Sequence, residues 1–351
     1  MAPEGLAGAP ADQGMGGSSA EAGQGNDTEP SRTVLLDSVV ISSDADALHF
    51  QSATADVDFG EASVASAKLL VELTSPCFPF SKWAEQGVPD GQRWPARCDA
   101  FDRTLSVSLD DAEPDATPPG IELVRAVTPF GGPMQLEVDV TDVVNGLPGL
   151  HRLRLRIDTW SDADGLVSGS SGEWQASVSL ETTLGAAPRR VLAVVPLVLE
   201  SQTAADATPV ELRVPQGVGS ARLDYVVTGH GGVPELGCTA EEFCQRAHEL
   251  RLDGQLLEEL FPWRSDCGNL CTITANDAGA GPSSYCAENP CGAPESVRAP
   301  RANWCPGSVT PPFVIEKAAL TVAGRHELTR SIRGLREGGQ WRVSATYFAF
   351  E

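Results

Sequence analysis

Residues 151–157 read HRLRLRI, in which polar and apolar side chains alternate from Arg152 to Ile157. A period of two is the pattern of a β-strand that buries one face. The same alternation occurs in TLSVSL at 104–109, QLEVDV at 135–140 and ASVSL at 176–180. Further strand-like runs lie at 31–41, 64–74, 191–199, 221–228 and 341–350.

The Asp253-Gly254 pair between LRL and QLL predicts a hairpin. Helical patterns are scarce, and we expect at most a turn or two of helix in residues 235–246. The pattern therefore predicts an all-β protein built of sandwiches or jelly rolls.

The length of 351 residues exceeds what one hydrophobic core usually organises, so we expect two domains. The stretch TTLGAAPRR at 182–190 separates two strand-rich halves. We therefore place domain 1 at 32–186 and domain 2 at 187–351, with a disulfide-rich loop at 262–307. Residues 1–31 are rich in Gly, Ala and Ser and are predicted to be a flexible linker or tail. No internal sequence repeat is evident.

The charge restricts the partners of this chain. With 48 acidic and 25 basic residues it carries a net charge of -23, which repels phosphate backbones and anionic membrane surfaces. Nucleic acid is thereby excluded as the main partner, whereas a neutral glycan is not. No apolar stretch is long enough to span a membrane, because the longest, Val191 to Leu199, contains Pro196.

The cysteines and the N-terminus indicate an exported protein. The first thirty residues have no apolar segment of a signal peptide. Linkers of this composition follow signal peptides or lipid-anchored cysteines, and we expect that the initiating Met stands in place of an export signal. Nine cysteines, five of them from Cys267 to Cys305, predict disulfides and an oxidising compartment. No C-x2-C pair is present, so a zinc ribbon has little support. We predict a secreted, periplasmic or cell-surface protein in which at least one cysteine is unpaired or bonded to another chain.

Four segments in a fixed order carry a resemblance to a known family. They are CDAFDR at 98–103, LEVDVTD at 136–142 with IDTW at 157–160, GHG at 229–231 with Cys238 and EFC at 242–244, and RANWCPG at 301–307. Together with AVVP at 193–196, they resemble the peptide-N-glycosidase F family over about residues 32 to 350.

The resemblance implies a fold and an activity. The fold would be two consecutive eight-stranded antiparallel jelly-roll domains packed side by side, with the active site in the cleft between them. The activity would be hydrolysis of the amide between an Asn side chain and the first N-acetylglucosamine of an N-linked glycan. The products would be Asp and a glycosylamine, with no cofactor or metal required. We expect N-glycosylated peptides or proteins as substrates and a monomer in solution.

The resemblance also implies disulfides. The pairs it gives are Cys77–Cys98, Cys238–Cys244 and Cys267–Cys305. The remaining three cysteines lie in a segment that looks like an insertion. There we expect Cys271 to pair with either Cys286 or Cys291.

Three carboxylates are the candidate catalytic groups, since amide hydrolysis needs an activated water, help for the leaving nitrogen and stabilisation of an oxyanion. The resemblance makes Asp102 the principal catalytic residue and Glu242 the group that positions or activates water. Glu241 is a rival to Glu242, because Cys238 and Cys244 enclose TAEEF, a longer loop than in the family. Asp158 stands where the family has Glu, and its shorter side chain moves the carboxylate by over ~1 Å.

Six further residues are expected to bind substrate. Arg103 and Arg301 would hold substrate or stabilise charge, Trp160 and Trp304 would pack against sugar faces, and His230 and Asp99 would complete the polar contacts. The two arginines could instead order loops, and Trp304 could instead pack on the disulfide of Cys305. Thr228 and Phe101 stand near positions where the family has Trp, which reduces the aromatic surface.

Three other classes of protein are alternatives to an amidase. A non-catalytic glycan-binding protein that uses the same cleft is the main alternative. A copper monooxygenase of similar architecture is disfavoured, because the five histidines are scattered and form no H-H or H-x-H pair. A serine hydrolase lacks its G-x-S-x-G motif. Asp162 and Asp164 resemble a fragment of a calcium loop, but a plain turn is favoured because the later Glu is missing. The amidase predicts that Asp102, Asp158 and Glu242 converge within about 10 Å in one interdomain cleft.

Overall fold

The computed structural model describes residues 29–111, 119–234 and 238–351. The tail predicted over residues 1–31 lies outside the described residues up to position 28. Among the described residues, no helix is long and apolar enough to cross a membrane.

The first domain consists of two antiparallel four-stranded sheets in the orders β1-β8-β3-β6 and β2-β7-β4-β5. This is a jelly-roll order, in which consecutive strands lie in different sheets except for the paired strands β4 and β5. Two short helices, α1 (Lys82–Gln86) and α2 (Thr141–Gly146), lie in the connections. The strands are β1 (Ser31–Ser42), β2 (Ser52–Asp58), β3 (Val64–Thr74), β4 (Thr104–Leu109), β5 (Ile121–Val127), β6 (Met134–Asp139), β7 (Leu150–Ile157) and β8 (Glu173–Leu184).

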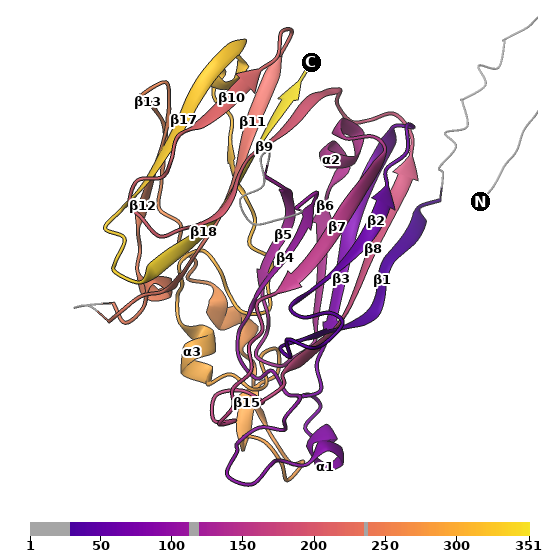
Figure 1. Cartoon of the computed structure of the whole chain (residues 1–351), viewed down its shortest axis with the longest axis vertical. Coiled ribbons are helices and arrows are strands. Elements are labelled where there is room, and N and C mark those ends of the chain that lie inside the picture. Colours follow the sequence, from indigo (N-terminus) through magenta and orange to yellow (C-terminus); the bar gives the residue numbers. More distant parts are fainter. Residues whose placement is uncertain (1–28, 112–118, 235–237) are drawn as a thin grey trace, which may run out of the picture.

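The second domain repeats this arrangement beside the first (Figure 1). Its sheets have the orders β16-β11-β18-β9 and β10-β17-β12-β13, which are the orders of the first domain once the hairpin β14-β15 is left out. The main strands are β9 (Val191–Gln202), β10 (Val210–Val214), β11 (Ser220–Gly231), β12 (Ala247–Leu252), β13 (Gln255–Leu260), β16 (Phe313–Ile315), β17 (Gly324–Arg333) and β18 (Gly339–Phe350). Between them lie η1 (Glu241–Phe243), η2 (Cys267–Leu270), β14 (Ile273–Ala275), β15 (Ser284–Cys286), α3 (Pro294–Arg298) and η3 (Ala318–Thr321).

The all-β class with two consecutive antiparallel jelly-roll domains is thus confirmed. The division that we propose near residue 186 falls in the connection between β8 and β9. Asp253-Gly254 forms the turn between β12 and β13, as the hairpin signal predicted. In the stretch 235–246, the helical residues that the structure describes are the single turn η1.

The alternating strands bury one face in the core of each domain. On β7, Leu153, Leu155 and Ile157 are buried, while the arginines between them are only partly covered. Burying such a side chain contributes about 1.5–3 kcal/mol relative to exposure. Phe348 and Phe350 of β18 pack into the core of the first domain rather than that of the second. The two domains therefore share apolar packing, which fixes the surfaces that face each other.

Four disulfides and one free thiol account for the nine cysteines, all of which lie in the described residues. Three bonds are the pairs that the family resemblance implied, and Cys271 pairs with Cys286 of its two possible partners. Cys291 is left as a free thiol. The bonds are Cys77–Cys98, Cys238–Cys244, Cys267–Cys305 and Cys271–Cys286.

Each jelly roll contains a His–Asp pair at the same position in its topology. His151 of β7 contacts Asp110 after β4, with 2.7 Å between Nδ1 and Oδ2. His326 of β17 contacts Asp253 after β12, again with 2.7 Å between these atoms. Both aspartates have positive φ, 52° and 51°. The other ring nitrogen meets the main-chain oxygen four residues earlier in both cases. This pair reveals a weak repeat, GLHRL at 149–153 and GRHEL at 324–328, that was missed in the sequence.

Candidate active site between the two domains

A pocket of about 400 Å³ lies between the domains and collects most of the residues that the motifs singled out. Seven of the predicted site residues line it, together with residues of β18. The lining residues are Phe101, Asp102, Arg103, Thr104, Val127, Asp158, Trp160, His230, Gly231, Ala240, Glu242, Trp304, Gln340 and Arg342.

Antiparallel pairing brings these segments together. The start of β4 lies beside the end of β7, where Leu105 is opposite Ile157. Asp102, which precedes β4, is therefore near Asp158, which follows β7. In the second domain, the last residue of β11, Gly231, is opposite the first residue of β18. Residues far apart in the sequence thus meet at strand ends, where side chains are not committed to a core.

Arg301 joins carboxylates from the two domains. Its Nη2 lies 3.9 Å from Asp102 Oδ2 and its Nη1 lies 3.3 Å from Glu242 Oε1. Nη2 also donates to the main-chain and hydroxyl oxygens of Ser296, at 2.8 and 2.9 Å. The guanidinium carbon lies 4.3 Å from the centre of the Trp304 ring. Because Arg301 is fully buried, its charge acts on both carboxylates with little screening by solvent.

Burial sets the protonation of the two carboxylates. It raises the pKa of Asp102 above its ordinary value, against the opposing charges of Arg301 and Arg103. It raises the pKa of Glu242 to about 7, with Arg301 lowering it and Asp102 raising it further. Glu242 is thus poised between its two forms near neutral pH, and Asp102 holds a proton more readily than an exposed aspartate.

His230 is neutral at physiological pH. Burial and three nearby arginines lower its pKa to about 3. Its Nε2 lies 2.9 Å from Thr228 Oγ1, and its ring stacks on Trp304 with 5.4 Å between ring centres. A neutral imidazole here contributes hydrogen bonding and shape rather than charge.

The two adjacent glutamates of η1 have different environments. Glu242 lines the pocket. Glu241 is fully buried behind it, where it pairs with Arg246 at 2.8 Å and accepts a hydrogen bond from Trp341 Nε1 at 2.8 Å. Glu241 is therefore committed to internal contacts, and Glu242 is the one that can reach a ligand.

Asp158 reaches the pocket while held by two arginines. Its Oδ1 accepts from Arg156 Nε at 2.7 Å, and its Oδ2 pairs with Arg342. Arg342 is a pocket residue that sequence reasoning missed, because its place in the alternation of β18 matched an ordinary outward-facing side chain. Gln340 was missed for the same reason.

Asp99, which is predicted to bind substrate, lies behind the pocket rather than in its lining. Asp99 is completely inaccessible and lies outside the pocket lining. Its carboxylate accepts hydrogen bonds from Arg103 at 2.6–2.9 Å, and also from Thr159, Ser168 and Trp174 at 2.7–2.9 Å. An unpaired buried charge would be costly, so this network explains why an aspartate is tolerated there. Asp99 thus holds the guanidinium of Arg103 in place.

Arg103 in turn orients an aromatic surface. Its guanidinium carbon lies 4.4 Å from the centre of the Trp160 ring and 5.1 Å from that of Phe101. Trp160 and Phe101 are 41% and 38% exposed. They therefore form an apolar wall at the pocket that is open to a ligand. The neighbouring Asp162 accepts main-chain N–H groups from residues 164 and 166–168, as an aspartate in a tight turn does.

The fold and the site together define a two-domain jelly-roll protein with a buried carboxylate–arginine site between its domains. Within that class, residues 199–347 match the sequence model of the family described as "Peptide-N-glycosidase F, C terminal". This range contains His230, Glu242, Arg301 and Trp304. The resemblance to the peptide-N-glycosidase F family that the sequence motifs indicated is thereby confirmed.

Individual relatives agree with this family. The chain is 25% identical over 236 residues to peptide-N(4)-(N-acetyl-beta-D-glucosaminyl)asparagine amidase F of Elizabethkingia miricola, covering 61% of this chain and 57% of that protein. Among solved structures, PNGase F of Flavobacterium meningosepticum has a TM-score of 0.63 at 18% identity, with 92% of this chain and 96% of that chain covered. The structure of PNGF-II has a TM-score of 0.67 at 19% identity, with 92% and 66% covered. The amidase alignment thus spans little more than half of that relative's length.

Proposed function

We propose that this protein is an amidase of the peptide-N-glycosidase type. It would hydrolyse the bond between an Asn side chain and the first N-acetylglucosamine of an N-linked glycan. The printed name of the Elizabethkingia miricola relative describes this chemistry for that protein, and the likeness of the sequences supports its transfer.

The observation that carries the proposal is the bridge through Arg301. One buried guanidinium lies 3.9 Å from the carboxylate of Asp102 in the first domain and 3.3 Å from that of Glu242 in the second. A protein that only binds neutral sugars has no need of two carboxylates with raised pKa values in one pocket. An amide hydrolase does need such a pair, since one group must accept a proton and another must supply one.

The chemistry follows from these environments. Glu242, with its pKa of about 7, accepts a proton from the attacking water. The water oxygen bonds to the amide carbon, and the buried charge of Arg301 stabilises the negative charge on the carbonyl oxygen from behind the pocket lining. The C–N bond then breaks, and Asp102 supplies the proton that the leaving nitrogen takes. The products are an Asp side chain and a glycosylamine, which releases ammonia in water.

The remaining pocket residues would bind and orient the glycan. Trp160 and Phe101 present exposed ring faces, and Trp304 supports the stacked His230 ring. Asp158, fixed between Arg156 and Arg342, would accept hydrogen bonds from sugar hydroxyls or help to place the water. Arg103 would hold the aromatic wall in place.

The test is hydrolysis of a denatured N-glycoprotein in heavy-oxygen water, followed by the mass of the peptide at the glycan site. The wild-type protein should convert Asn to Asp with one labelled oxygen in the new carboxylate. Asp102→Asn should lose this activity, while the exposed matched control Asp46→Asn should keep it.

The alternative function, glycan binding without catalysis, is distinguished by measuring cleavage and binding of the same glycopeptides. If glycopeptides of varied glycan structure stay intact across pH 5–9 but bind the protein, the protein is a glycan-binding relative that has lost catalysis. If neither cleavage nor binding occurs, the pocket does not serve N-glycans at all. Location outside the cytoplasm, N-glycosylated proteins as partners and a monomeric state complete the proposal.

A further inference from the structure

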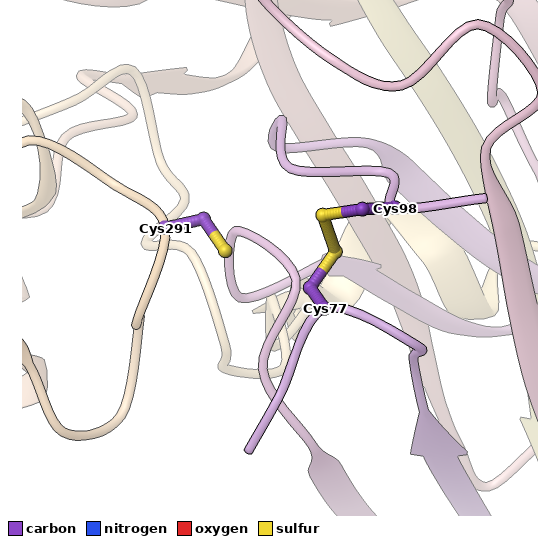
Figure 2. A group of neighbouring side chains, drawn as sticks. All are labelled: Cys77, Cys98 and Cys291. Carbon is purple, nitrogen blue, oxygen red and sulfur yellow. A yellow bond between two sulfur atoms is a disulfide. The ribbon is translucent and has the colours of Figure 1, made fainter. Parts of the chain in front are cut away.

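Cys291 lies against a disulfide that belongs to the other domain. The Sγ atoms of Cys77, Cys98 and Cys291 all lie within 4.8 Å of one another. Figure 2 shows the sulfur of Cys291 pointing toward the Cys77–Cys98 bond. Cys77 and Cys98 come from connections of the first domain, between β3 and β4, whereas Cys291 comes from the connection between β15 and α3 of the second.

A glycine keeps the space beside two of these sulfurs open. A Cβ placed on Gly131 would lie 2.8 Å from Cys77 Sγ and 2.9 Å from Cys291 Sγ. A side chain at position 131 would therefore clash with both sulfur atoms. The backbone of Cys291 is fixed by a hydrogen bond of 3.0 Å from its N–H to the oxygen of Phe130. The thiol is thus held beside Cys77 by a connection that is itself anchored to the first domain.

We propose that the three cysteines form a thiol–disulfide exchange site that can join the two domains by a disulfide. The Cys291 thiolate attacks Cys77 Sγ, the Cys77–Cys98 bond breaks, and Cys98 leaves as the thiolate. One disulfide is replaced by another and one thiolate by another, so the step requires no oxidant or reductant. The product is a Cys77–Cys291 disulfide between the domains.

The surroundings of Cys291 hold this exchange in check. Burial raises the pKa of the Cys291 thiol, and the negative charge of Asp99 raises it further. Because the thiolate is the attacking species, the exchange is slow while the structure is closed at neutral pH. Local opening near Cys291 would remove this restraint, so exchange should accompany partial separation of the domains.

The exchange would change which parts of the chain are tied together. The Cys77–Cys98 bond links residues 21 positions apart, whereas Cys77–Cys291 would enclose most of both domains. Closing a longer loop restricts the unfolded chain more strongly. Around the same place, Tyr285 packs on Phe78 and Phe80, with ring centres 5.9 and 5.1 Å apart. The new disulfide would restrain the domains so that this apolar contact between them is kept. This inference does not depend on the amidase proposal.

The test is disulfide mapping of the full chain by mass spectrometry under non-reducing, acid-quenched conditions. The Cys98→Ser variant, refolded in a glutathione redox buffer, should contain a Cys77–Cys291 peptide as its major new linkage. The matched variant Cys291→Ser should keep Cys77–Cys98. Free thiols at both Cys77 and Cys291 in correctly folded Cys98→Ser would overturn the proposal.

A measurement on the unaltered protein covers the case in which Cys98→Ser does not fold. The wild type is incubated at about pH 9, where more thiolate forms, in mildly destabilising urea and with no added thiol, and then alkylated. The proposal expects the alkylated cysteine to shift from Cys291 to Cys98 with time. Alkylation that stays on Cys291 alone under these conditions would refute it.

Discussion

Replacing Glu242 by Gln should lower activity and raise stability together. Burial raises the pKa of this carboxyl from 4.5 to about 7 in the folded protein. The folded state therefore binds the proton more tightly than the unfolded chain between these two pH values. Stability contributed by this group is present below pH 4.5 and is lost as pH rises through 7. Gln cannot ionise, so the variant avoids this loss.

The size of the stability change follows from the pKa shift of Glu242. At about 1.4 kcal/mol per pKa unit, ionised Glu242 costs up to about 3 kcal/mol above pH 7. For catalysis, a base with a pKa near 7 is about 1% ionised at pH 5 and mostly ionised at pH 8. The kcat/KM of the wild type should therefore rise about tenfold per pH unit up to pH 7, until Glu242 is ionised, and fall only where Asp102 loses its proton. Loss of the base should lower the maximal rate by about 10²–10⁴-fold.

The assay combines a pH–rate profile on an N-glycopeptide with urea unfolding at pH 5 and pH 8. Glu242→Gln should be more stable than the wild type at pH 8 and similar to it at pH 5, and its rate should no longer rise over this range. The exposed control Glu337→Gln should change neither property. A wild-type rate that is flat from pH 5 to pH 8, or a variant that keeps the rise, would refute the role of Glu242 as the base.

Three further predictions concern the groups around the site and the core. Asp99→Ala should destabilise the protein by about 3–5 kcal/mol in urea unfolding, because Arg103 would keep a buried unpaired charge; a loss below 1 kcal/mol would contradict the network. Asp158→Glu should lower kcat/KM by about 10–100-fold, since a displacement near 1 Å breaks its paired contacts, and an increase would mean that aspartate is too short. His248 is buried with its pKa lowered from 6.5 to about 3, so the unfolded chain binds its proton first and stability falls as pH drops below 6.5. His248→Gln should weaken that acid sensitivity by about 1 kcal/mol per pH unit at pH 4–6, and an unchanged pH dependence would show that carboxylates alone cause it.

The strands could be predicted from the sequence because their cause is local. Alternation in 151–157 or 104–109 reports directly which face is buried, and these runs become β7 and β4. The order of strands in the sheets depends on contacts between distant segments, which alternation does not encode. The jelly-roll arrangement was therefore expected from the resemblance of the motifs and not from periodicity.

The same limit applies to the site, where the sequence identifies the motifs but not the direction of each side chain. Asp102 and Asp99 stand three positions apart in one motif, yet one lines the pocket and the other is sealed beneath Arg103. Glu241 and Glu242 are adjacent, and only the geometry of η1 decides which of them faces inward. Arg342 gave no signal because its role depends on Asp158, a partner from the other domain. Residue type and spacing identify the motif, whereas the direction of each side chain requires the fold.

The His–Asp pairs of the two domains bear on the ancestry of the chain. Two jelly rolls with equal sheet orders also share a histidine on the seventh strand that reaches an aspartate after the fourth, in both cases at positive φ. Duplication of one ancestral domain accounts for this coincidence more simply than independent origin. In that history the first ancestor had no pocket of the present kind, since Asp102 and Glu242 come from different copies. A site built from both domains would have arisen only after fusion, when the facing surfaces of the two copies could change independently.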